Sequence, residues 1–185
     1  MTHSTQGEAL ARKSESVLKR LPDGAPILIR PILADDKRML ENGLRHLSPS
    51  SVQRRFLTPK RSFSRAELRY LTEVDGRDHV ALVAEYHGEP VRRLIAVARF
   101  VRLHDDPEAA EVAIVVADDW QRRGLGSLLS QQLAARARGR GIRRFTATMS
   151  GDNTPAHRLM ARMTRHLEER HTGFGVSEVV LDLAA

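Results

Sequence analysis

A glycine-rich loop after an apolar run is the part of this sequence best suited to hold a ligand. Residues 112–117 are mostly β-branched and lead through an acidic turn into Gln-Arg-Arg-Gly-Leu-Gly at 121–126, which a helical pattern follows from Ser127 to Arg140. Glycine lets the backbone approach a ligand closely. The unpaired N–H groups at a helix start attract phosphate. The order strand, loop and helix therefore predicts a site for a phosphorylated cofactor.

Two common phosphate-binding motifs do not match this loop. A Walker loop requires Lys-Ser or Lys-Thr after its second glycine, whereas Leu125-Gly126-Ser127 follows Gly124 here. The dinucleotide fingerprint needs three glycines at the first strand–helix turn of a long parallel unit. This loop has two glycines and lies past the middle of the chain. Neither nucleotide-binding motif is therefore expected.

The helices and strands that must position this loop are expected in a mixed order along the chain. Residues 1–24 resemble a polar tail or a loosely attached helix, and residues 25–185 form one domain. Helices are expected after Asp35-Asp36, from Ser48 to about Phe56, after Ser64, from 127 to 140 and after Asp152 or Asn153. Strands are expected at 27–30, 79–86, 94–101, 112–116, 142–149 and, as one strand or two, 174–183. Early hairpins and a later strand–helix alternation predict one α/β (α+β mixed) sheet with helices on both faces.

The amino-acid composition and charge argue against membranes, nucleic acids and metal ions as binding partners. There is no cysteine, and no apolar run reaches the ~18 residues of a membrane span, so we expect a cytoplasmic protein without membrane contact. The net charge is +7, but its 30 basic residues are scattered among 23 acidic ones and aromatic residues make up only 4%. Because there is no basic–aromatic stripe, nucleic acid is not expected as a partner. Histidines lack metal-ligand spacing, which predicts no metal site.

The loop and the helix after it resemble the GNAT superfamily of acyl-CoA-dependent N-acyltransferases. Gln121, Gly124 and Gly126 match the family's Gln/Arg-x-x-Gly-x-Gly/Ala motif, and Asn153 followed by Ala156 resembles its Asn-x-x-Ala helix. The resemblance implies a six- to seven-stranded mixed sheet and acetyl-CoA as the acyl donor, in a protein that is a monomer or a homodimer. It implies a cofactor site formed by Ile114, Val115, Val116, Gln121, Arg122, Arg123, Gly124, Leu125, Gly126, Ser127 and Asn153.

A narrower resemblance connects the chain to bacterial Pat-type protein lysine acetyltransferases. It rests on the segment from Ile29 to Ile32, the segment 47–56, and Glu111-Val112-Ala113. A lysine amine is mostly cationic at neutral pH, with a pKa near ~10.4, so a general base is useful. An acid at a strand entrance is by itself more often an ordinary solvated side chain. The resemblance implies instead that Glu111 is the catalytic base.

Several points remain open at this level. The side chains of Arg122 and Arg123 are equally suited to pair with CoA phosphates or to lie in solvent. Tyr70 and Tyr86 are far from the position of the tyrosine that protonates the leaving thiolate in many GNAT enzymes. The preferred acceptor is a protein lysine. The alternatives are a small-molecule amine and a binding module that holds acyl-CoA without turnover.

Overall fold

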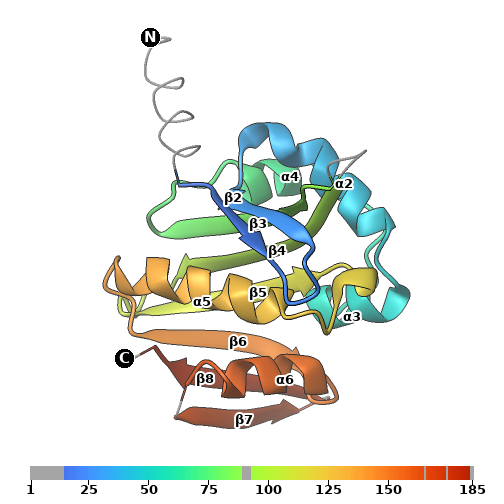
Figure 1. Ribbon diagram of the computed structural model, residues 1–185. Helices are drawn as coiled ribbons and strands as arrows, with labels where there is room; N and C mark the ends of the chain where they lie inside the picture. Colours follow the sequence, from blue (N-terminus) through green and yellow to red (C-terminus); the bar gives the residue numbers. More distant parts are fainter. Residues whose placement is uncertain (1–14, 89–92, 165, 174, 184–185) are drawn as a thin grey trace.

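One mixed sheet of eight strands forms the centre of the molecule (Figure 1). The computed structural model describes residues 15–88, 93–164, 166–173 and 175–183. Across the sheet the order is β1 (Val17–Arg20), β2 (Pro26–Pro31), β3 (His79–Tyr86), β4 (Arg93–Arg102), β5 (Ala109–Val116), β6 (Arg144–Ser150), β8 (Val176–Asp182) and β7 (Leu167–Gly173). Only β5 and β6 are parallel. The predicted mixed sheet is confirmed.

The strand count differs from the expected six to seven because two edge strands give no apolar signal. Strand β1 lies inside residues 1–24, which the sequence describes as a tail or loose helix, and pairs antiparallel with β2. Residues 1–14 of that segment lie outside the described ranges. Strand β7 has one partly buried residue followed by six exposed ones, and its pairing with β8 fixes it in place. When both faces of an edge strand are exposed to solvent, its sequence lacks the alternation of apolar and polar residues that predicts a strand.

Helix starts follow their capping residues. The helices are η1 (Ala34–Asp36), α2 (Lys37–Arg45), α3 (Pro49–Phe56), α4 (Arg65–Thr72), η2 (Asp118–Trp120), α5 (Leu125–Arg138) and α6 (Thr154–Ala161). Ser48 and Asn153 each accept a hydrogen bond from the N–H three residues on. Ser64 forms a reciprocal capping box with Glu67. These contacts satisfy N–H groups that the helix leaves free, so the expected starts of α3, α4 and α6 are confirmed.

The two faces of the sheet have separate cores. On one face, α5 packs over every second residue of the central strands, among them Leu82 of β3, Ala98 of β4 and Val112 of β5. Met160 of α6 belongs to the same cluster. Figure 1 shows α5 and α6 over this face. On the other face, Leu40 of α2 and Leu68 of α4 pack on the intervening residues of β3 and β4. Side chains alternate along a strand, so neighbouring residues of β5 face opposite sets of helices.

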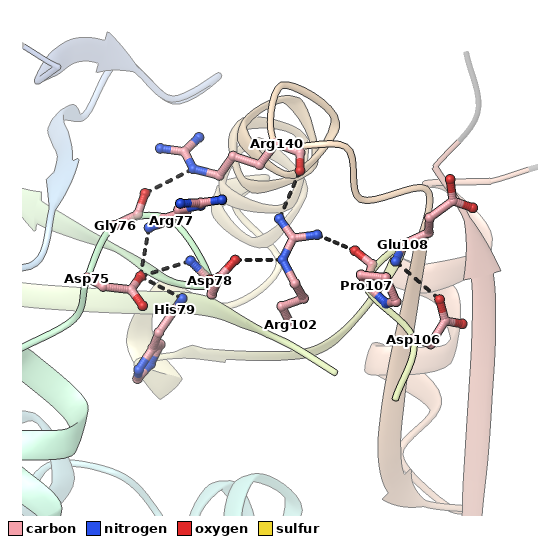
Figure 2. A network of polar contacts seen from close by, with 10 residues as sticks. All are labelled: Asp75, Gly76, Arg77, Asp78, His79, Arg102, Asp106, Pro107, Glu108 and Arg140. Carbon is pink, nitrogen blue, oxygen red and sulfur yellow. Dashed lines mark hydrogen bonds and ion pairs between the residues drawn. The ribbon is translucent and has the colours of Figure 1, made fainter. Parts of the chain in front are cut away.

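A polar network holds the sheet at the end where β5 begins. One carboxylate oxygen of Asp75 accepts three backbone N–H groups, and the last of them, at 2.9 Å, is that of His79. Arg102 donates to Asp78 at 2.6 Å and to the carbonyl of Arg140, just after α5, at 2.8 Å (Figure 2). These bonds join the loop before β3, the end of β4 and the end of α5. At this end β5 and β6 are paired, whereas toward the opposite end of β5 the pairing stops after Glu111.

Candidate active site

A cleft opens where β5 and β6 separate. The two strands pair only between Ala109–Glu111 and Arg144–Thr146, although both continue further. The cleft has a volume of about 860 Å³ and is lined by residues 111–116 of β5 and 147–149 of β6. It is also lined by parts of α3, α6 and the glycine loop. An extended ligand can therefore take the place of a strand between β5 and β6.

The backbone of β5 presents alternate groups to this cleft. Ala117 donates its N–H to the Ile95 carbonyl, and the Ala109 carbonyl accepts from Leu103, so odd-numbered residues direct their backbone groups toward β4. In an antiparallel ladder the even-numbered residues point the other way. The N–H groups of Ile114 and Val116 therefore face the side where β6 has moved away. Val115 directs its amide toward β4 and packs its side chain against the core under α2 and α4.

The glycine loop is a backbone concavity at the start of α5. Gly124 is the N-cap residue with φ 85°, and Arg122 has φ 60°. Left-handed residues at such a turn direct successive N–H groups inward and form an anion site. A Cβ built on Gly126 would lie 3.6 Å from Leu159 Cδ2 and 3.8 Å from Val116 Cγ2, which is ordinary contact. Packing within the protein therefore does not require glycine at position 126. Because Gly126 lines the cleft and has no side chain, it leaves space there for a ligand.

The side chains of the loop divide into two groups. Arg122 and Ser127 line the cleft together with both glycines. Arg123 points elsewhere: its Nε donates to Asp23 at 2.6 Å, and its guanidinium stacks 3.9 Å from the centre of the Trp120 ring. Leu125 is 1% exposed and belongs to the core under α5. The structure therefore separates the two arginines that the sequence could not distinguish.

Gln121 and Asp118 connect the loop to α3. The Gln121 side-chain nitrogen donates to the Val116 carbonyl at 3.1 Å and to Ser51 Oγ at 3.2 Å. Asp118 accepts hydrogen bonds from Ser51 Oγ at 2.6 Å and from the N–H and Oγ of Ser48, each at 2.8 Å. Although burial works to raise the pKa of Asp118, these hydrogen bonds outweigh it and hold the pKa below its usual value.

This connection was missed by the sequence analysis. Ser48 and Ser51 stand about seventy residues before Asp118, and an acid within an acidic turn gives no sign of a distant partner. Because Asp118 is negative and lies at the first turn of α3, it complements the unpaired N–H groups there. The segment that contains the glycine loop and helix α3 over the other face are therefore fixed to each other.

Helix α6 contributes a second group of polar residues to the cleft. Asn153 lines it and is 9% exposed, and its side chain accepts from the Ala156 N–H at 3.3 Å. Arg158 and Arg162 also line the cleft, and in the described part of the chain neither forms an ion pair. The sequence analysis missed both arginines. They lie on the same face as the glycine loop and add positive charge beside it.

The opposite side of the cleft carries the carboxylate. Glu111 is exposed, lines the cleft and pairs in register with Val101 and Thr146. Its side chain lies on the face covered by α3, from which Arg54, Arg55, Phe56 and Leu57 also line the cleft. Glu111 is the only carboxylate among the described lining residues. This placement gives a base direct access to a molecule that enters from the α3 side.

The remaining polar residues of the described chain include several histidines and two tyrosines. Within the described ranges, no three histidine or acidic side chains are grouped as a metal site. His157 lies on α6 with Nδ1 3.6 Å from a carboxylate oxygen of Glu169. Neither Tyr70 nor Tyr86 lines the cleft. No helix in the described ranges is long and apolar enough to cross a bilayer.

Comparison with known proteins decides the family. Residues 49–164 match the model of the Acetyltransferase (GNAT) family, a span that includes α3, the cleft, the glycine loop and α6. The chain belongs to the GNAT acetyltransferase family. The acyl donor of these enzymes is acetyl-CoA, whose phosphates and extended thiol arm suit a cleft with a backbone anion site at its rim.

Individual relatives agree with this assignment. The chain is 38% identical over 152 residues to the acetyltransferase Pat of Mycolicibacterium smegmatis, covering 82% of this chain but 44% of that protein. It is 30% identical over 136 residues to the acetyltransferase PA5475 of Pseudomonas aeruginosa, covering 74% and 73% of the two chains. The crystal structure of the GNAT domain of S. lividans PAT superimposes with a TM-score of 0.81 and 30% identity, over 91% of this chain and 97% of that one. The chain is therefore a member of the GNAT family that is similar to Pat and spans less than half the length of the M. smegmatis protein.

Proposed function

We propose that this GNAT domain transfers the acetyl group of acetyl-CoA to the side-chain amine of protein lysines. The observation that carries the proposal is the two-sided cleft, with a backbone anion site on the α5 and α6 side and Glu111 on the α3 side. The likeness to Pat and to the GNAT domain of S. lividans PAT supports a protein acceptor. We expect the domain to act inside the cytoplasm.

Donor binding in this proposal uses mainly backbone groups. The N–H groups of residues 122–127 hold the pyrophosphate, since they converge at the start of α5. Arg122, Arg158 and Arg162 add charge next to it, and Asn153 lies where the thiol arm passes α6. The arm runs between β5 and β6. The amide groups of Ile114 and Val116, which face this gap, pair with it.

The chemistry follows from the same placement. Glu111 takes a proton from the lysine ammonium, directly or through a water molecule, and the neutral amine then attacks the thioester carbonyl. The carbonyl becomes a tetrahedral oxyanion, which a backbone N–H of β5 at Ile114 or Val116 stabilises; one such donor is worth about 3 kcal/mol. The C–S bond breaks, the second amine proton is lost to solvent, and CoA leaves as a thiolate that water protonates.

Acetylation of a protein extract tests the proposal. Purified wild-type protein and Glu111→Gln are each incubated with acetyl-CoA and the extract, and acetyl-lysines are counted by mass spectrometry. We expect acetylation by the wild type and very little by the variant. If the wild type acetylates no protein but consumes acetyl-CoA with small amines, the protein acceptor is wrong. Acetyl-CoA binding without any turnover would indicate a binding module instead.

A further inference from the structure

The α3 side of the cleft contains arginines that have no acidic partner. Arg54 and Arg55 line the cleft there, and Arg99 of β4 lies behind them on the same face, in register with Ala113. In the described part of the chain none of the three forms an ion pair with a carboxylate. Glu111 is the only acid that lines this side. A molecule that enters from the α3 side therefore meets a positively charged surface.

Three arginines in other parts of the molecule show how such a charge is balanced by a carboxylate. Arg30 is 2.7 Å from Asp36 and also pairs with Glu85, Arg102 is 2.6 Å from Asp78, and Arg144 is 2.8 Å from Asp106. Burying a charge without an opposite partner costs free energy. Arg55 and Arg99 are at least partly buried beside the cleft and form no salt bridge with a described carboxylate, and a ligand is one means of compensating their charge.

Arg99 is the most buried of the three. It is 6% exposed, and its guanidinium donates to the Leu71 carbonyl at 3.1 Å and lies 3.2 Å from His79 Nε2. Burial lowers the pKa of Arg99 to about 10, with a further contribution from the neighbouring Arg55 cation, so it stays charged at neutral pH. Arg99 thus supplies a fixed positive charge behind the cleft wall.

Arg55 is the arginine best placed to meet an acceptor. It lines the cleft, and its guanidinium lies 4.9 Å from the centre of the Phe56 ring, a contact that does not use up its hydrogen-bond donors. Burial lowers its pKa, while the Glu111 carboxylate works in the opposite direction. Arg55 and Glu111 both line the α3 side of the cleft, so an acidic group held by Arg55 brings its neighbouring amine close to Glu111.

Resting on the proposed function, we infer that the acceptor is a lysine flanked by acidic residues, whose carboxylates pair with Arg54 and Arg55. The same positive charge disfavours a polycationic acceptor such as a polyamine. It also favours the neutral form of the entering amine, because a nearby cation lowers the pKa of an ammonium group. Arg54 and Arg55 thus act as specificity determinants. The buried Arg99 adds to the positive electrostatic potential on the same side of the cleft.

Three matched peptides test the inference. Each carries one lysine, flanked on both sides by Glu, by Gln or by Arg, and kcat/KM is measured with acetyl-CoA saturating. We expect the wild type to prefer the Glu peptide over the Gln peptide about tenfold, the size of one charge-assisted hydrogen bond, and to use the Arg peptide least. Equal rates with all three peptides would overturn the inference while leaving the proposed function intact.

Variants of the cleft arginines test whether these residues cause the preference for the Glu peptide. Arg55→Gln should reduce the Glu-to-Gln ratio several-fold, and the double variant Arg54→Gln, Arg55→Gln should reduce it to about twofold or less, since the remaining charge then acts only through solvent. Arg55→Glu should reverse the order and favour the Arg peptide. Arg61→Gln removes the same charge from an exposed position outside the cleft lining, so it should keep the full ratio. A ratio lost equally in Arg61→Gln would overturn the inference in favour of net charge.

Two checks keep the result interpretable. Acetyl-CoA affinity and Tm of Arg55→Gln are measured alongside, and Arg54→Gln replaces it if Arg55→Gln does not fold. If no peptide is acetylated by the wild type while a diamine or a free amino acid is, the proposed protein acceptor itself fails. That outcome is distinct from equal rates with the three peptides, which contradicts only the acidic preference.

Discussion

The two sides of the β5–β6 cleft present different kinds of group to a ligand. On the α5 and α6 side these are mainly backbone groups: the left-handed turn at Arg122 and Gly124, and a glycine that protein packing does not require. On the α3 side they are side chains: Glu111 and the arginines of α3. A site built from backbone groups is suited to an anion that is the same in every reaction. Long side chains, by contrast, can be substituted during evolution without disturbing the fold. The comparison suggests that the donor is fixed by the fold and the acceptor by a few replaceable residues.

The largest expected effect is on the α3 side. Glu111→Gln keeps the shape of the side chain but removes the base, so kcat at neutral pH should fall by about 100- to 1,000-fold. Activity should recover partly toward pH ~10, where a lysine amine loses its proton unaided. A pH series of initial rates with a lysine peptide measures both effects. Full activity of the variant at neutral pH would remove Glu111 from the mechanism.

A backbone change should affect the other side selectively. Gly124→Val forces a β-branched residue into φ 85°, which costs about 1–3 kcal/mol of strain and disturbs the anion site. Acetyl-CoA should bind at least tenfold more weakly, as measured by calorimetric titration. Gly141→Val is the matched control, since Gly141 has φ 78° with open space around it and lies outside the cleft lining. Equal loss of donor affinity in both variants would mean that strain, not the loop, is responsible.

The link between the two sides gives a smaller effect. Asp118→Ala removes the acceptor of the bonds from Ser48 and Ser51 and should destabilise the fold by about 2 kcal/mol, within the range for hydrogen bonds to a charged group. Because α3 is released, KM for the peptide should rise more than that for acetyl-CoA. Tm and the two KM values are the measurements.

The neighbouring acid is the control for this link. Asp119 is exposed and pairs with Arg93 at 2.8 Å on the surface, so Asp119→Ala should cost less than about 1 kcal/mol. It should also leave both KM values near those of the wild type. If Asp118→Ala behaved in the same way, the two sides of the cleft would be independent of each other.

The smallest effect concerns His79, which supports Arg99 behind the α3 side. Burial, with a contribution from Arg99, lowers the pKa of His79 to about 4 from the ordinary 6.5. The unfolded chain therefore binds more protons than the folded one between pH 6.5 and 4, so stability falls as pH falls through that window. His79→Gln should flatten the decline in Tm between pH 6.5 and 4. An unchanged slope would show that His79 is accessible to protons in the folded state.

The sequence predicted one side of the cleft much better than the other. On the α5 and α6 side, the glycine loop and the helix start at Asn153 are local motifs whose geometry follows from residue type. The pairing of Asp118 with α3 and the grouping of Arg55 with Arg99 depend on how distant segments meet, which no local pattern encodes. Arg122 and Arg123 were indistinguishable in sequence and were separated only by the position of Asp23 and Trp120.

The fold shows the same division. The strands with an apolar face and the helices with capping residues follow from their sequences. Strands β1 and β7 do not, because each lies at an edge of the sheet with few buried side chains and is held by backbone pairing to one neighbour. Edge strands owe their conformation to the partner strand, so the information that specifies them lies elsewhere in the chain.

Titration of acetyl-CoA into Glu111→Gln tests the division of the cleft most directly. If donor binding belongs to the α5 and α6 side and proton removal to the α3 side, the Kd for acetyl-CoA should stay within about twofold of the wild type. Turnover by the same preparation should fall by about 100-fold or more. A Kd weakened as much as turnover would contradict the account, because Glu111 would then act through donor binding or the fold itself.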